Sequence, residues 1–167
     1  NYPADLDAAV TGHTDPLYLT VKPPLFRIYS DVLNWLGATE GQSILDVGFG
    51  AGEILLVANE MGLDCWGLDV RQEYINLLQG KLPNATLLRS FGGNTPKEQF
   101  DIVMLGDVLE HIIELNPFVQ SMKHSLKPGG KLWVSTPNFD SVFGIYGGAN
   151  NIMRMVCEHI HWFSRKS

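Results

Sequence analysis

Hydrophobic and polar positions change their spacing several times along the chain. Between residues 23 and 36, apolar side chains recur at the three- and four-residue spacing of an amphipathic helix, which Gly37 ends. Beyond it, short apolar runs alternate with segments of helical pattern. The runs predict strands over 43–47, 64–68, 85–89, 100–105 and 131–135, and the segments predict helices over 53–61, 72–82 and 117–126.

The connections carry their own signals. Residues 90–99 are rich in Gly, Asn and Pro and predict a loop, whereas 107–115 predicts a helical turn or a short helix. Asn116 and Pro117 predict the N-cap and the first position of the next helix, and 127–130 (Lys-Pro-Gly-Gly) is typical of a turn. Strands that alternate with helices indicate a parallel sheet, and uninterrupted apolar strands indicate cover on both faces.

Composition narrows the possible partners. The formal net charge is −6 and no cluster of Lys and Arg is visible, which disfavours nucleic acid as a partner. No apolar stretch is long enough to span a membrane, and no signal peptide is apparent. Two cysteines, Cys65 and Cys157, make no disulfide framework, so we expect a buried free thiol at Cys65 and a cytoplasmic location.

A glycine-rich loop lies between the first predicted strand and the helix that follows. Gly48, Gly50 and Gly52 let the backbone turn tightly and approach a ligand closely. The spacing is G-x-G-x-G, and the dinucleotide pattern G-x-G-x-x-G fails because Glu53 occupies the last position. A glutamate would repel a pyrophosphate, which disfavours a nicotinamide oxidoreductase. A tight turn that binds no ligand is the alternative.

S-adenosylmethionine (SAM) is a ligand that this loop could bind. It carries no phosphate for Glu53 to repel, and its methionine end has both an ammonium and a carboxylate. Asp46 is suited to the ammonium, although it could instead only brace the loop. Asp69 ends the second strand 21 residues after Gly48, near the spacing of a ribose-binding acid, with Val70 beside it. Capping the next helix is the alternative role for Asp69.

Together these residues resemble the class I SAM-dependent methyltransferases. The resemblance covers about 43–135, and it rests on 44–52 (Ile-Leu-Asp-Val-Gly-Phe-Gly-Ala-Gly), 67–69, 100–103 and 126–132. A finer resemblance to the ubiquinone-biosynthesis O-methyltransferases and related small-molecule enzymes rests on 107–111 (Asp-Val-Leu-Glu-His), 135–138 and 158–164.

The resemblance implies an α/β, Rossmann-like three-layer sandwich with a mostly parallel sheet in the order 3-2-1-4-5. The family has seven strands, so we expect the C-terminal antiparallel hairpin to be missing and the chain to be part of a longer polypeptide. The fifth strand then has an open edge where a homodimer could form. We expect an N-terminal arm and helix over 1–37, a SAM-binding core over 38–137 and an acceptor-side cap over 138–167.

The resemblance also implies roles for individual residues. Ser90 and Phe91 fall where the family binds adenine, although the acid that many members carry there is absent. Gly106 falls at the methionine end. Arg27 falls where related enzymes carry an arginine that binds the SAM carboxylate, and an ordinary solvated side chain is its alternative role.

Histidines supply the candidate catalytic groups. An oxygen acceptor must lose a proton before or during methylation, and imidazole is suited to take it. His111, His159 and His161 are therefore the predicted catalytic residues, with packing or bracing as the alternative. In ubiquinone-type enzymes the run that resembles Asp107, Glu110 and His111 is associated with a divalent metal, but we expect no metal ligands here.

The function predicted from the sequence is SAM-dependent methyl transfer to a small-molecule acceptor, at oxygen, with S-adenosylhomocysteine (SAH) as the second product. The alternative is a non-catalytic domain of the same fold that only binds SAM or a partner.

Overall fold

The computed structural model of the chain describes residues 23–141 and 159–167, so the expectations for the arm over 1–22 and for most of the cap segment lie outside it. The helix α2 (Pro23–Trp35) begins with two prolines, whose missing N–H groups are not needed in a first helical turn. The helix ends at Trp35 and is followed by a turn over residues 36 and 37, where Gly37 has a φ of 69°. The Lys131 ammonium donates a hydrogen bond to the Leu36 carbonyl just beyond the helix end.

Strands and helices then alternate as the apolar pattern predicts. The strands are β1 (Ser43–Val47), β2 (Asp64–Leu68), β3 (Thr86–Leu88), β4 (Phe100–Gly106) and β5 (Leu126–Ser135). The helices between them are α3 (Glu53–Glu60), α4 (Gln72–Gln79), the short 3-10 helix η2 (Leu109–His111) and α5 (Leu115–Ser125). The segment between β3 and β4 contains no helix, which agrees with the predicted loop.

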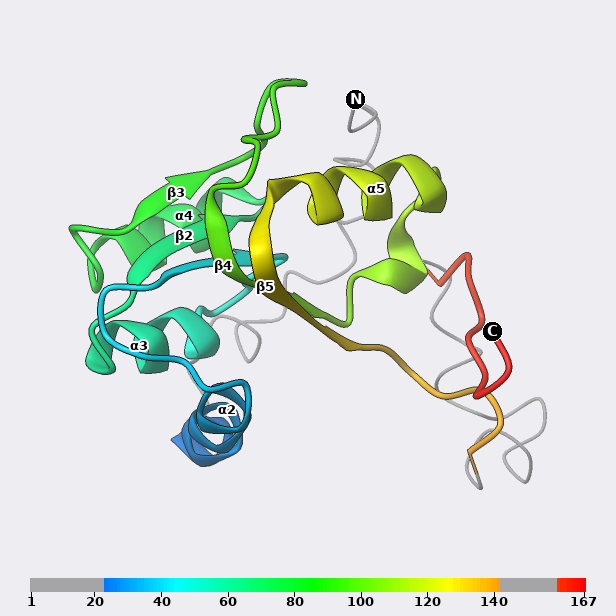
Figure 1. The fold of residues 1–167 in the computed structure, drawn as a ribbon, viewed down its shortest axis with the longest axis horizontal. Coiled ribbons are helices and arrows are strands. Elements are labelled where there is room, and N and C mark those ends of the chain that lie inside the picture. The colour runs from blue at the N-terminus through cyan, green and yellow to red at the C-terminus, as the bar shows by residue number, and fades with distance from the viewer. Residues whose placement is uncertain (1–22, 142–158) are drawn as a thin grey trace.

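The sheet has the predicted architecture. Its five strands lie in the order β3-β2-β1-β4-β5 and every pair is parallel (Figure 1). One face packs against α2, α3 and α4, and the other against η2 and α5. All five residues of β1 are buried, as expected for a central strand covered on both faces. The free thiol of Cys65 is buried in this core, as predicted.

Two local predictions were wrong. The helix α5 begins at Leu115 with Glu114 as its N-cap, so Asn116 and Pro117 lie inside the first turn and do not start the helix. Proline is tolerated there because the first turn needs no N–H donors.

The predicted turn over 127–130 lies inside β5. Leu126 pairs with Phe100 and Lys131 with Ile102, so four residues of β5 stand opposite the single residue Asp101. The Lys127 ammonium holds this bulge to the Asp101 carboxylate at 2.7 Å.

Among the described residues, β5 forms the edge of the sheet. Leu132 and Val134 on this strand are 37% and 40% exposed. The C-terminal segment returns nearby, where Asn138 and Phe163 form an isolated bridge. No helix in the described ranges is both long and apolar enough to cross a bilayer.

Candidate functional site

The strand order reverses between β2-β1 and β4-β5, which places a ligand crevice at the carboxyl ends of β1 and β4. The glycine loop follows β1 at this edge. Gly48, Gly50 and Gly52 all have positive φ, at 71°, 54° and 84°. L-residues with side chains rarely adopt this conformation, so the loop requires the glycines that the sequence supplies.

The three glycines serve different purposes. A Cβ at Gly48 would lie 2.7 Å from the Val108 side chain, and one at Gly52 would lie 2.5 Å from Leu78. Both positions are therefore glycine because protein atoms occupy the space. A Cβ at Gly50 would meet no atom within 4 Å. Gly50 is thus the position where the loop leaves room for a ligand.

Asp69 connects the loop to the end of β2. Its Oδ2 accepts a hydrogen bond from the Gly50 amide at 3.0 Å, and its Oδ1 accepts one from the Arg71 amide at 2.9 Å. Burial raises the pKa of this 6% exposed carboxyl group, and hydrogen bonds from the Arg71 and Gly50 amides oppose that rise. Each carboxylate oxygen can still accept a second hydrogen bond, which is what binding two ribose hydroxyls requires.

Asp46 occupies the fourth position of β1 and is 3% exposed. Burial raises the pKa of its carboxyl group well above the usual value, and the nearby Asp69 and Glu53 raise it further. The sequence places Asp46 in the glycine motif, but it gives no sign that several acids converge on this point.

Gly106 and Asp107 follow at the carboxyl end of β4. The Asp107 amide donates to the Ser135 carbonyl at 2.8 Å, and Asp107 has a φ of 54°, which is unusual for a residue with a side chain. Burial raises the pKa of Asp107, whereas the Ser135 hydroxyl and the imidazoles of His159 and His111 lower it. Two of the predicted catalytic histidines therefore lie near this carboxylate.

The remaining predicted cofactor residues are spread more widely. Ser90 is exposed, and its hydroxyl accepts a hydrogen bond from the Gly92 amide at 3.2 Å. The Phe91 ring stacks on Phe100 with centroids 6.4 Å apart, so this side chain covers the sheet. The Val70 carbonyl accepts from Arg89 Nε at 3.0 Å, and Arg27 is exposed on α2. For these four residues, as for the other predicted cofactor residues, the cofactor role stays a prediction.

The histidines gather beside η2. The rings of His111 and His159 lie edge to face with centroids 4.8 Å apart. The His161 amide donates to the Glu110 carbonyl at 3.1 Å, and His161 Nε2 lies 2.8 Å from the Ile112 carbonyl. A carbonyl can only accept, so Nε2 of His161 carries a hydrogen and cannot itself serve as a base.

Glu110 lies beneath this group. Glu110 is 1% exposed, and its Oε2 accepts a hydrogen bond from the Thr136 hydroxyl at 3.1 Å. Its Oε1 is buried and has no hydrogen bond from any residue that the structure describes. Donor atoms of Glu110, His111 and His159 lie within 4.8 Å of one another. Atoms that share one ion at about 2.0–2.2 Å lie at most about 4.4 Å apart. Two donor atoms that lie 4.8 Å apart are thus slightly too far from each other to bind the same ion. The side chains would have to move closer together first.

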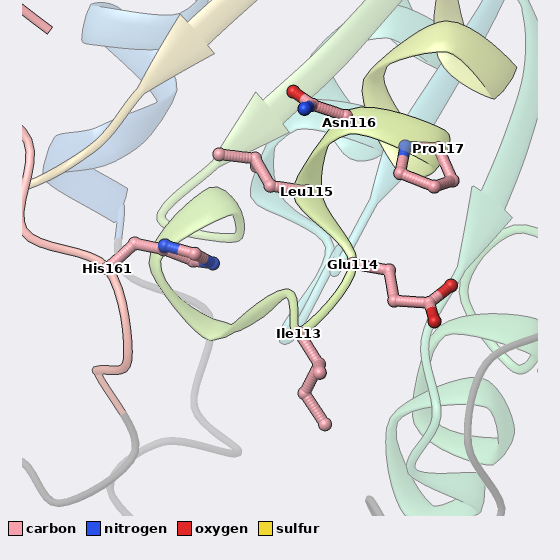
Figure 2. A pocket seen from close by; sticks show the side chains of 6 residues that line it. All are labelled: Ile113, Glu114, Leu115, Asn116, Pro117 and His161. Carbon is pink, nitrogen blue, oxygen red and sulfur yellow. The ribbon is translucent and has the colours of Figure 1, made fainter.

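An open pocket of about 530 Å³ lies between the start of α5 and the C-terminal segment (Figure 2). Its lining includes Glu114, Asn116 and His161, and Figure 2 shows the His161 ring turned toward the η2–α5 connection. No residue of the glycine loop lines it. The pocket is therefore separate from the candidate cofactor site.

Sequence reasoning missed two residues of the site. Arg71 contacts Asp69, with 3.8 Å between Nε and Oδ1, and lies 3.9 Å over the Tyr74 ring. Tyr29 lies in the range 23–36, where the sequence predicts an amphipathic helix and no functional residue other than Arg27. Burial raises its pKa to about 12, with contributions from Asp46, Glu53 and Asp107. Its helical spacing could not have revealed these neighbours.

Comparisons with known proteins agree with this arrangement. A family model described as a methyltransferase domain matches residues 24–167. A ubiquinone biosynthesis O-methyltransferase of Bradyrhizobium diazoefficiens is 29% identical over 80% of this chain and 54% of its own length. One of Acinetobacter baumannii is 27% identical over 83% of this chain and 64% of its own length. The chain thus spans between about half and two thirds of the length of these relatives.

Solved structures show the same fold. A SAM-dependent methyltransferase of Aquifex aeolicus aligns with a TM-score of 0.60 at 22% identity, over 73% of this chain and 76% of that one. The [4+2]-cyclase SpnF aligns with a TM-score of 0.58 at 22% identity, over 64% and 43%. The names differ, so the shared fold does not by itself define a reaction. With the family model covering most of its length, the chain belongs to the class I SAM-dependent methyltransferase family.

Proposed function

We propose that this chain transfers the methyl group of SAM to an oxygen atom of a small-molecule acceptor. The observation that carries the proposal is the direct contact between two loops. The space beside Gly48 is occupied by Val108, so the segment that carries His111 packs against the glycine loop. Imidazole groups and the candidate cofactor site therefore lie at the same edge of the sheet.

The residues present fit the cofactor of the family. The open space at Gly50, the two lone pairs left on Asp69 and the buried carboxylate of Asp46 provide for the nucleoside and for the positive charge. When bound, SAM supplies a methyl group already activated by its sulfonium. The protein then has to orient the acceptor, exclude water and take up the acceptor proton.

His159 and His111 are the proposed proton acceptors. His161 Nε2 is committed to the Ile112 carbonyl, so we assign His161 the task of positioning the segment that carries His159. The ubiquinone biosynthesis relatives are named O-methyltransferases, which supports oxygen as the methylated atom. A cytoplasmic location, a homodimer and the absence of nucleic-acid binding stay predictions.

A turnover experiment tests the proposal. The protein is incubated with SAM and pooled phenolic and other hydroxylated metabolites, and mass spectrometry searches for products that have gained one methyl group. The proposal expects such a product together with an equal amount of SAH. SAM binding without product from any pool would favour the alternative, a domain that binds SAM without turnover.

Exchanging His159 for glutamine is expected to lower kcat while leaving the Kd for SAM unchanged. The exchange removes a base beside His111 but no group of the glycine loop. Calorimetry gives the Kd, and the rates across the pH range show whether the pH dependence of kcat has changed. An unchanged pH profile and kcat would contradict a catalytic role for His159.

Excess chelator is expected to leave turnover unchanged, because methyl transfer from a sulfonium needs no metal. Glu110, His111 and His159 nevertheless form a potential donor set, so the assay is repeated with EDTA and with added Mg²⁺, Mn²⁺ or Zn²⁺. Loss of turnover in chelator, restored by one of these ions while the Kd for SAM stays constant, would overturn the expectation.

A further inference from the structure

Arg71 occupies the N-cap position of α4, two residues after Asp69. N-cap positions favour Ser, Thr, Asp or Asn, because the side-chain oxygen accepts a hydrogen bond from a free N–H group of the first turn. A guanidinium has no acceptor, and the Arg71 side chain makes no such cap. The start of the helix therefore does not explain an arginine at this position.

The Arg71 side chain instead contacts two of its neighbours. Its Nε lies 3.8 Å from Asp69 Oδ1, the same oxygen that accepts a hydrogen bond from the Arg71 amide at 2.9 Å. Its guanidinium carbon lies 3.9 Å from the centre of the Tyr74 ring, and Tyr74 is a buried residue of α4. A planar guanidinium that stacks on a buried ring loses little further freedom when it also pairs with a carboxylate. The ring thus keeps the positive charge beside Asp69.

The distance between Arg71 and Asp69 allows attraction between their charges without a hydrogen bond. At 3.8 Å the Nε donor is beyond hydrogen-bond range of Oδ1, and it has no other hydrogen bond among the described residues. The second lone pair of Oδ1 therefore stays available to a ribose hydroxyl. Since the Nε atom is buried, a ribose cannot reach it, and this atom can act on a ligand only through Asp69.

A positive charge beside Asp69 matters because this acid is buried. Asp69 is 6% exposed, and burial raises the pKa of its carboxyl group, whereas the Arg71 and Gly50 amides and the Arg71 charge lower it. Two ribose hydroxyls each donate a hydrogen, so the carboxyl group must be ionised for both of its oxygens to accept. The Arg71 side chain is 29% exposed, so water screens part of its charge and we expect an effect of moderate size.

We propose that Arg71 is a positioning residue of the cofactor site, which keeps the Asp69 carboxylate ionised and in one orientation for the ribose of the cofactor. The proposal rests on the proposed function only for the cofactor and is independent of the acceptor. It predicts a pattern that a general effect of charge would not give. Loss of one positive charge would by itself favour the cationic SAM over the neutral SAH, whereas a disturbed Asp69 weakens binding of every ligand that carries the ribose.

Calorimetric titration of Arg71→Gln with three ligands tests the proposal without any turnover. SAM, SAH and methylthioadenosine share the ribose but differ in charge and in the methionine end. Each should bind about fivefold more weakly, a change within the range of coupling between contacting residues. Lys81→Gln is the control, since it removes a positive charge from an exposed position beyond the end of α4 and should change none of the three Kd values.

A double-mutant cycle shows whether Arg71 acts through Asp69. In the Asp69→Asn background, where the carboxylate is already absent, adding Arg71→Gln should change the Kd for SAM by less than about twofold. A residue that only stabilises α4 would weaken binding by the same factor in both backgrounds. Arg71→Lys, which keeps the charge but not the planar group, should recover part of the affinity that Arg71→Gln loses.

The Tm of each variant shows whether it is folded, and if Arg71→Gln does not fold, the cycle is run with Arg71→Lys, whose smaller loss must likewise vanish in Asp69→Asn. Unchanged Kd values in Arg71→Gln, opposite shifts for SAM and SAH, or an equal loss in both backgrounds would overturn the proposal. So would a folded Arg71→Lys that binds as weakly as Arg71→Gln. Failure of the natural protein to bind SAM would instead overturn the cofactor assignment.

Discussion

Replacing Gly50 with valine should weaken SAM binding by about 100-fold or more, equivalent to about 2.7 kcal/mol, while the domain stays folded. No protein atom lies within 4 Å of a Cβ at this position, so the new side chain would occupy space left for the ligand. The positive φ of 54° adds a conformational cost of about 1–2 kcal/mol to the folded state.

Gly52→Val is the matched control. Its Cβ would lie 2.5 Å from a Leu78 methyl group, so this variant should lose roughly 2–5 kcal/mol of unfolding free energy. Urea unfolding monitored by circular dichroism separates the two effects from the Kd measured by calorimetry. A folded Gly50→Val that binds SAM as tightly as the natural protein would show that the ligand does not approach this loop.

The second large effect is expected at Asp69. Replacement by alanine removes the acceptor for the Gly50 and Arg71 amides and any hydrogen bond to the ribose. Loss of a hydrogen bond to a charged group costs about 1.5–3 kcal/mol, so the Kd for SAM should rise roughly 10- to 150-fold. Calorimetric titration of the folded variant measures this change.

Asp64→Ala serves as its control. Asp64 is exposed at the opposite end of β2, where its carboxylate accepts from the Trp66 indole at 3.1 Å. Loss of this acid should leave the Kd unchanged, although both variants remove one negative charge, Asp64 from the first residue of β2 and Asp69 from the residue just after it. Equal affinity in Asp69→Ala and the natural protein would remove Asp69 from the cofactor site.

The sheet could be predicted because its signals are local. Each strand is a short apolar run in the sequence. A run that is apolar without interruption, such as β1, indicates a strand buried on both faces and therefore in the middle of the sheet. The order β3-β2-β1-β4-β5 needed the resemblance as well, since a run of apolar residues does not specify its neighbours. The start of α5 was missed because a favourable pair, Asn116-Pro117, competes with tertiary packing that begins the helix at Leu115.

The parts of the site that could be predicted are those where an unusual backbone conformation requires a particular residue type. Gly48, Gly50 and Gly52 could be found because positive φ requires glycine, and Asp69 because of its distance from them. The convergence of Tyr29, Glu53 and Asp46 could not be found, since these residues come from α2, α3 and β1 and meet only in three dimensions. The same holds for Phe91, whose ring reaches Phe100 across a loop.

The hydrogen bonds of the glycine loop run to β2. The Gly48 and Phe49 amides donate to the Leu68 carbonyl at 2.7 and 3.4 Å, and the Gly50 amide donates to Asp69 at 3.0 Å. The loop can therefore form only after β1 and β2 have paired. Its amide protons should exchange with solvent as slowly as those of the central strands, although they belong to a loop. A partly unfolded chain that has lost β2 would lose the candidate cofactor site in the same cooperative step.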